Sequence, residues 1–186
     1  MEGGNPTVGG QWDVGPSGLL LESDIARSAQ ERLGATIYQF AYEPAGSRYA
    51  DLLRVAQRFC AYLTLVMQEF TWTSRAHEAI EQLKQWHLED HQVKEWPGTQ
   101  TLKSATMMIF KFDAGTVGAL SGLARRLYQW EQPDLPEDLC LFRPTGEPWL
   151  VSISHERDGW LHLRPDEAEA VISAVRPLPL RRAESE

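Results

Sequence analysis

The sequence predicts a single α+β (mixed α/β) domain in which helices pack against a central mixed sheet. Three observations predict this class. Apolar residues at helical spacing alternate along the chain with short runs that favour strands. The C-terminal third, about residues 139–163, has the pattern of an antiparallel three-stranded meander. The length of 186 residues and an apolar content of 42% suit one domain with its own core.

The two ends of the chain differ in composition from the middle. Residues 1–18 are rich in glycine and proline, and residues 177–186 combine proline with charged residues. Both segments are expected to be flexible tails, because chain ends are poorly ordered unless something ties them down. The predicted domain therefore spans residues 19–176.

Most elements are predicted by a start signal followed by a periodic apolar pattern. Ser, Thr or Asp precedes several of the helical patterns, and Pro165 opens the last one, as expected of helix N-termini. The predicted elements are a helix from Ser23 to Leu33, a strand from Thr36 to Glu43, a helix from Ser47, a helix from Thr73 or Ser74 to Trp86, a strand from Thr106 to Phe112, a helix after Asp113 and a helix from Pro165. Gly115, Gly118 and Gly122 lie inside the helix after Asp113, where they suggest close packing on a neighbour.

Residues 59–67 form a continuous apolar run that a buried strand or a continued helix would both explain. We favour the strand, and the helix remains open. Cys60 lies in this run and Cys140 lies in another. Both are expected to be buried free thiols, with a disulfide as the alternative.

The balance of acidic and basic residues argues against one class of function, nucleic-acid binding. The formal net charge is −8, with 18 basic and 26 acidic residues and a pI near 5.2. Nucleic-acid binding is therefore not expected, because it depends on clustered lysine and arginine. The start of the chain lacks the basic and apolar regions of a signal peptide, and no apolar run is long enough to span a bilayer. We expect a cytoplasmic protein that does not bind membranes.

The meander predicts the most specific site. If Thr145-Gly146 and Asp158-Gly159 are two-residue turns, His155 lies directly opposite His162, close to Trp149 and Trp160. Opposed imidazoles suit a metal site or a proton-transfer pair. The alternative is an ordinary cross-strand pair at the solvated end of the sheet.

Both faces of the meander are apolar, which predicts that its central strand is covered on both sides.

A second pair of histidines gives a weaker metal candidate. His87 and His91 would share one face if the segment were helical. The glutamate that follows the first histidine in zinc-protease helices is missing. A solvated helix end explains the pattern as well.

Residues 130–138 form an acidic, proline-containing stretch that precedes the meander, and this composition predicts a docking loop. It would attract a basic partner by charge, with tryptophans as anchors. An ordinary solvated connector is the alternative. The predicted partner-binding residues are Trp130, Glu131, Asp134, Glu137, Asp138, Trp149 and Trp160.

Two segments in the same region carry a resemblance. Residues 135–140 (Leu-Pro-Glu-Asp-Leu-Cys) and residues 146–156 (Gly-Glu-Pro-Trp-Leu-Val-Ser-Ile-Ser-His-Glu) resemble the C-terminal part of small uncharacterised bacterial proteins. The two segments are also loosely similar to immunity proteins of bacterial toxin systems. The resemblance covers about a quarter of the chain and brings no catalytic residues with it. It implies a binding protein.

The sequence thus favours a non-enzymatic protein-binding or regulatory protein, and an immunity-type inhibitor of a basic partner is the specific form that the resemblance implies. No catalytic residue and no cofactor is predicted for this role. One alternative is a small metal-dependent hydrolase that holds a divalent ion through the histidines. Another is a structural subunit of a larger assembly. The sequence leaves the oligomeric state open.

Overall fold

The computed structural model describes residues 34–69 and 71–183. Their strands form one eight-stranded sheet in the order β3-β4-β2-β5-β6-β7-β1-β8, and all neighbouring strands are antiparallel. The elements in chain order are β1 (Thr36–Phe40), α2 (Ser47–Ala56), β2 (Tyr62–Met67), α3 (Ser74–Leu83), β3 (His87–Trp96), β4 (Thr99–Lys111), α4 (Ala114–Leu123), β5 (Glu137–Phe142), β6 (Pro148–Ile153), β7 (Asp158–Leu163), α5 (Pro165–Ala174) and β8 (Leu180–Arg182). The α+β class is confirmed, although the sheet is antiparallel in the described residues and not mixed.

The local predictions agree with these bounds over most of the chain. The ambiguous apolar run contains the strand β2, so the helical alternative is wrong there. Asp113 caps α4 by accepting the backbone N–H groups of Gly115 and Thr116, and Pro165 is the first residue of α5. The polar segment from His87 to Trp96 is the strand β3, which the sequence did not predict. The helix expected from Ser23 lies outside the described residues.

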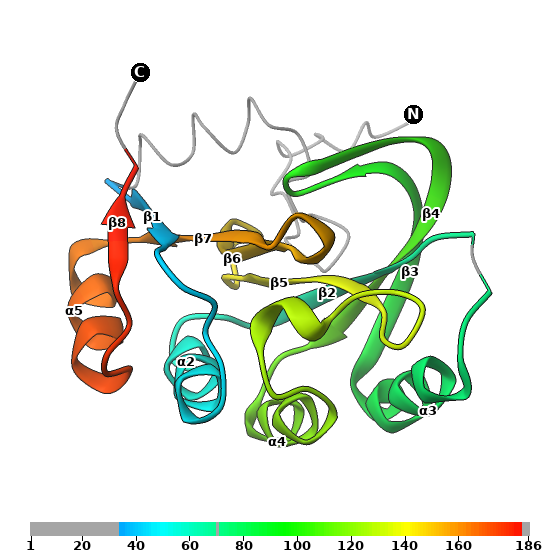
Figure 1. Cartoon of the computed structure of the whole chain (residues 1–186), viewed down its shortest axis with the longest axis horizontal. Helices are drawn as coiled ribbons and strands as arrows, with labels where there is room; N and C mark the ends of the chain where they lie inside the picture. Colours follow the sequence, from blue (N-terminus) through cyan, green and yellow to red (C-terminus); the bar gives the residue numbers. More distant parts are fainter. Residues whose placement is uncertain (1–33, 70, 184–186) are drawn as a thin grey trace, which may run out of the picture.

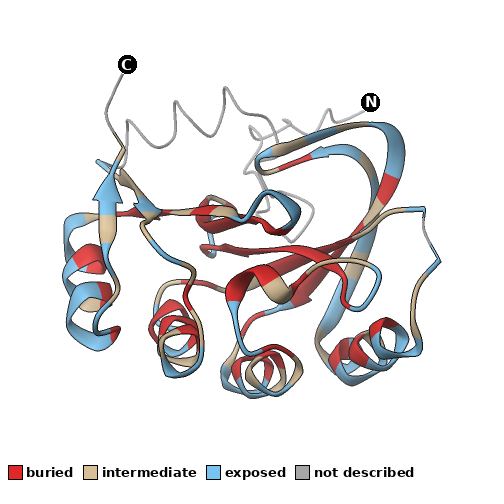
Figure 2. Cartoon of the chain, viewed as in Figure 1, coloured by how far each residue is buried: buried red, intermediate tan, exposed pale blue. Residues whose placement is uncertain are grey.

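The four helices lie side by side along one face of the sheet (Figure 1). The main core fills the space between the two layers, where α2 and α4 contribute Leu52, Leu53 and Leu120. Leu63 and Leu141 reach it from β2 and β5. Figure 2 shows the buried residues gathered on the inner sides of the helices and along the central strands.

The opposite face of the sheet is covered in part by the β3–β4 hairpin, which bends over it (Figure 1). A second cluster of buried residues forms there: Val66, Trp96, Ala105, Met107, Ile109, Cys140, Phe142 and Val151. Gly98 at the hairpin tip has a backbone φ of 82°, and a Cβ placed on it would lie 2.8 Å from Ile153 and 2.9 Å from Trp160. The meander is thus covered on both faces, as its apolar pattern predicts.

The three-stranded meander is confirmed as β5, β6 and β7. In its first hairpin Leu141 pairs with Leu150, as a two-residue turn at Thr145-Gly146 requires, but a bulge then pairs Phe142 with Pro148. The bulge changes the direction of Trp149, whose ring stacks on Phe59 of the helix-side core with centroids 6.2 Å apart. Trp149 therefore lies on the opposite face from the one that strict alternation predicts.

A buried ion pair joins the meander to α5. The guanidinium of Arg143 donates to both carboxylate oxygens of Glu167, at 3.1 and 2.6 Å, and also to the carbonyls of Pro148 and His162. Both side chains are 3% exposed. A buried guanidinium requires this degree of hydrogen bonding, because an unpaired charge in the core costs several kcal/mol, roughly 3–5.

The expectations for the cysteines and the chain ends have different outcomes. Cys60 and Cys140 are both buried and free, and they belong to the two separate core clusters. The C-terminal segment is not a tail throughout, since β8 pairs with β1 at the edge of the sheet. The predicted N-terminal tail lies outside the described residues. None of the helices within residues 34–69 and 71–183 combines the length and apolar character needed to cross a bilayer.

Candidate functional site

The predicted pair of His155 and His162 does not form. Residues 154–156 make a single 3₁₀ turn, and Arg157 follows with a left-handed φ of 57°. β7 begins at Asp158, which pairs with Ile153, so Gly159 belongs to the strand. A Cβ on Gly159 would lie 3.0 Å from the Val151 carbonyl oxygen. Gly159 is needed because the two strands approach closely here. In the sequence alone, the same Asp-Gly pair looks like a two-residue turn.

The two histidines consequently have different environments. His162 pairs with Ile37 of β1 and is buried. Its Nε2 accepts the indole N–H of Trp160 at 2.9 Å. Burial, with a smaller contribution from Arg143, lowers the pKa of His162 to about 4. His162 is therefore neutral near pH 7, while His155 lies in the turn with its side chain 45% exposed.

The second predicted histidine pair is also not assembled. His87 and His91 lie on the strand β3 and not on a helix. His87 contacts Asp90 at 2.8 Å, and His91 lies 3.3 Å from Glu89. Within the described ranges, no group of three His, Cys, Asp or Glu side chains is placed to hold a metal ion.

The predicted docking loop is largely inside the protein. Trp130 is fully buried, and its indole N–H donates to the Tyr49 hydroxyl at 2.8 Å. Trp149, Glu137 and Asp138 are also buried. These four residues cannot contact a partner, so that part of the prediction is wrong.

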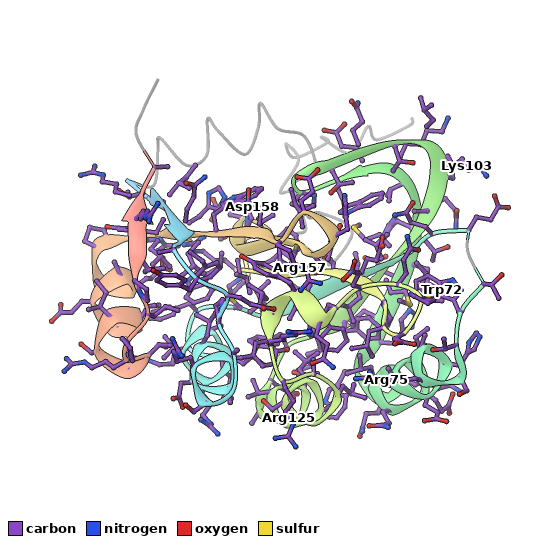
Figure 3. All side chains as sticks on the ribbon, in the orientation of Figure 1. Trp72, Arg75, Lys103, Arg125, Arg157 and Asp158 are labelled. Carbon is purple, nitrogen blue, oxygen red and sulfur yellow. The ribbon has the colours of Figure 1, made fainter. Side chains whose placement is uncertain are left out.

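The remaining three predicted partner residues lie near the surface. Asp134 is exposed, and Trp160 is half-buried beneath the hairpin tip. Glu131 lies 3.5 Å from Arg157 of the β6–β7 turn, and Figure 3 labels Arg157 at this turn. The composition of the stretch indicated solvent exposure, but its acids are divided between the surface and the core.

Asp138 connects three segments that are distant in sequence. One carboxylate oxygen accepts the indole N–H of Trp96 at 2.8 Å, and the other accepts the backbone N–H of Ser154 at 2.8 Å. The hydroxyl of Thr99 lies 3.5 Å away. Asp138 is fully buried and has a left-handed φ of 57°. The hairpin tip and the β6–β7 turn are thus both attached to the start of β5.

Glu137, next to Asp138 in the chain, connects this part of the core to the surface. Glu137 is buried and accepts a hydrogen bond from the side-chain amide of Gln68 at 2.6 Å. Burial is the main cause that raises the pKa values of Glu137 and Asp138. Gln68, just after the end of β2, is one of the residues that line an open groove.

This groove lies between the end of β2, the segment that follows it and both strands of the β3–β4 hairpin, and we call it the hairpin groove. Its volume is about 670 Å³. It is lined by Met67, Gln68, Glu69, Trp72, Gln92, Lys94, Leu102, Lys103, Ser104 and Thr106. Gln92 pairs with Thr106, and Thr106 pairs with Met67, so three adjacent strands present side chains to one face here. Met67 packs at the margin of the helix-side core, which makes the groove an uncovered continuation of that face.

A bulge in β4 shapes the outer wall of the groove. Val93 pairs with Ala105 and Glu95 pairs with Gln100, so residues 101–104 oppose Lys94 alone. The Thr101 hydroxyl accepts the backbone N–H of Lys103 at 3.0 Å, a local bond within these extra residues of β4. The bulge directs Leu102 outward with 97% of its surface exposed. Figure 3 shows Lys103 at the bend of β4 and Trp72 farther along the same side of the molecule.

Sequence reasoning missed this site. Leu102 is a single apolar residue within a polar run, and that pattern was the available signal. The bulge that exposes it depends on pairing between two strands. Compared with protein-family models, curated proteins and solved structures, the chain shows no significant match.

Proposed function

We propose that this protein is a non-enzymatic binding protein that contacts another protein through the hairpin groove. The single observation that carries the proposal is the position of Leu102, which the β4 bulge holds in solvent at the rim of a groove that Trp72 and Met67 also line. A scattered surface leucine needs no explanation. This one is held out by a structural irregularity at the rim of a groove that also contains a tryptophan. Burying such a leucine in a complex contributes roughly 1.5–3 kcal/mol.

The sequence resemblance favours one form of the proposal. In this form the protein inhibits its partner by covering the partner's functional surface, as an immunity-type inhibitor does. The resemblance itself stays a prediction. The mechanism needs no reacting group on this chain, because occupying the partner's functional surface is enough to inhibit it. Apolar anchors at the centre of such an interface supply most of the affinity.

The expectation of a basic partner rests on the net charge of −8 of the whole chain, and the charge is not evenly divided along it. Residues 34–183 carry 19 of the 26 acidic and 16 of the 18 basic residues. Three of those acids (Glu137, Asp138 and Glu167) are buried, as is one of the bases (Arg143). The surface of the described part is therefore close to neutral, and its overall charge does not favour a cationic partner.

Site-specific photo-crosslinking in the host cell tests the proposal. A benzoylphenylalanine in place of Leu102 should give a discrete covalent adduct with another protein on irradiation. The matched control carries the same group in place of Ile172, an apolar residue of α5 that is 53% exposed and outside the groove. We expect no such adduct from the control.

The other outcomes contradict the proposal in different ways. Equal adducts from both positions, or none from either, would show that the hairpin groove is not a specific contact surface. An adduct between two copies of this chain would support the structural-subunit alternative. Mass spectrometry of the excised adduct separates these cases.

A further inference from the structure

We infer that the hairpin groove takes an extended protein segment that combines an acidic side chain with a neighbouring apolar one. This inference rests on the proposed function and adds the chemistry of the bound segment. It follows from the positions of two lysines, two amides and three apolar side chains around the groove.

The charged groups of the groove favour an acidic ligand. Lys94 lies on β3 and Lys103 on β4, so the two ammonium groups come from both strands of the hairpin at its bend. Both residues are exposed. The one carboxylate in the lining, Glu69, lies 3.7 Å from Lys103, and these two side chains are 82% and 80% exposed. An ion pair this exposed contributes little to stability, and the lining carries two lysines against one carboxylate, which is an excess of positive charge.

The apolar side chains favour a protein segment over a simple anion. Leu102 is at the outer wall, and Met67 and Trp72 are half-buried in the lining. A bound leucine or aromatic side chain would remove apolar surface from water on both partners. A nucleic acid would need more lysine and arginine than the two lysines present here.

The polar side chains suit an extended backbone. The side-chain amide of Gln68 donates to Glu137, and that of Gln92 donates to Thr106 at 2.8 Å. Each amide nitrogen has one N–H engaged in this way, and the amide oxygens of both residues remain as acceptors. Backbone N–H groups of an extended segment are the donors that would match them.

Selection of short random peptides displayed on phage, with the immobilised full chain as target, tests the inference. We expect the recovered peptides to combine Asp or Glu with Leu, Phe or Trp. Replacing both groove lysines (Lys94→Ala with Lys103→Ala) should weaken binding of a recovered peptide by about tenfold, more at low than at high salt. The matched control, Lys84→Ala with Lys111→Ala, removes two exposed lysines outside the groove and should change the affinity less than twofold.

A second variant separates this inference from the proposed function. Leu102→Asp should abolish binding of every groove peptide, while Ile172→Asp should leave it unchanged. Another outcome is that peptides without carboxylates bind through Leu102 with an affinity that the lysine substitutions do not change. That result would contradict the inference of an acidic segment, but the groove would still be the contact surface. Peptides that bind Leu102→Asp as well as the parent, or no peptide at all, would count against both. Displacement of the bound peptide by single-stranded oligothymidylate at an equal charge concentration would overturn the inference in favour of a polyanion site.

Discussion

The indole N–H of Trp96 donates to the carboxylate of Asp138 at 2.8 Å, although the two residues are 42 positions apart in sequence. Trp96 ends β3 and Asp138 lies near the start of β5, so this bond attaches the hairpin tip to the centre of the sheet. The left-handed backbone of Asp138 costs about 1–3 kcal/mol and persists because three segments hold the residue in place. Asp138 is therefore a positioning residue for the hairpin, and through it for the shape of the hairpin groove.

The Asp138→Ala variant should lower the free energy of unfolding by about 3 kcal/mol. It removes an acceptor from two buried donors, the Trp96 indole and the Ser154 amide, and each is left without a partner. Urea unfolding followed by circular dichroism measures the change. Glu156→Ala, at a neighbouring exposed acid, should stay within about 0.5 kcal/mol of the parent. Equal losses in the two variants would show that Asp138 has no special role.

His162 should make the protein less stable in acid. Its pKa is lowered from 6.5 to about 4. Above pH 6.5 the imidazole is neutral in both states, so it contributes no pH dependence. As the pH falls from about 6.5 to about 4, the unfolded chain binds a proton that the folded protein excludes, and the folded state loses up to about 3 kcal/mol.

His162→Gln tests this assignment, because glutamine does not titrate. The difference in unfolding free energy between parent and variant should shift in favour of the variant between pH 7 and pH 4. Other titrating groups cancel in this difference. A difference that stays constant across that range would show that His162 protonates normally in the folded protein.

Breaking the buried ion pair should be strongly destabilising. Glu167→Ala leaves the guanidinium of Arg143 charged and buried without its carboxylate, which costs about 3–5 kcal/mol. Glu169→Ala, an exposed acid two residues later on α5, is the matched control and should change stability by less than about 0.5 kcal/mol. Chemical denaturation of the two variants side by side gives the comparison. A small loss for Glu167→Ala would mean that water or a rearranged side chain solvates Arg143.

Two glycines of α4 should respond oppositely to alanine. A Cβ on Gly115 would lie 2.6 Å from the Trp86 ring, whereas a Cβ on Gly118 would have no neighbour within 4 Å. Gly118→Ala should therefore raise the unfolding free energy by about 1 kcal/mol through helix propensity. Gly115→Ala should lower it, because the indole must move. Thermal melting distinguishes the two, and a stabilising Gly115→Ala would show that the contact yields easily.

Local signals were enough to predict most elements. Asp113 and Pro165 start helices through chemistry contained within one turn, and the alternation of Leu139 and Leu141 with Cys140 and Phe142 assigns the two faces of β5. The faces of β6 and β7 were mostly right even though the second hairpin register was wrong. The observed register is shifted by an even number of residues, and an even shift keeps each side chain on its face.

The candidate site depended on contacts that no local pattern encodes. Asp-Gly at 158–159 is a strong turn signal, yet Gly159 is in a strand because Val151 and Tyr128 approach it closely. Trp130 looked like an exposed anchor in an acidic loop, but its partner Tyr49 is 81 residues away. The strand β3 was missed because its residues are mostly polar, as expected for a strand at the end of the sheet order that has little core to face.

The sequence alone determined the fold class, the helices from Ser47, Ser74, Ala114 and Pro165, and the two apolar faces of the meander. These properties follow from interactions within a few residues and from the solubility of each side chain. Only the tertiary structure decided which acids are buried, where the histidines lie and that Leu102 stands in solvent at the groove that Trp72 also lines. Those outcomes depend on the pairing of β3 with β4 and on the bend of that hairpin over the sheet, which bring together residues that have no local reason to meet.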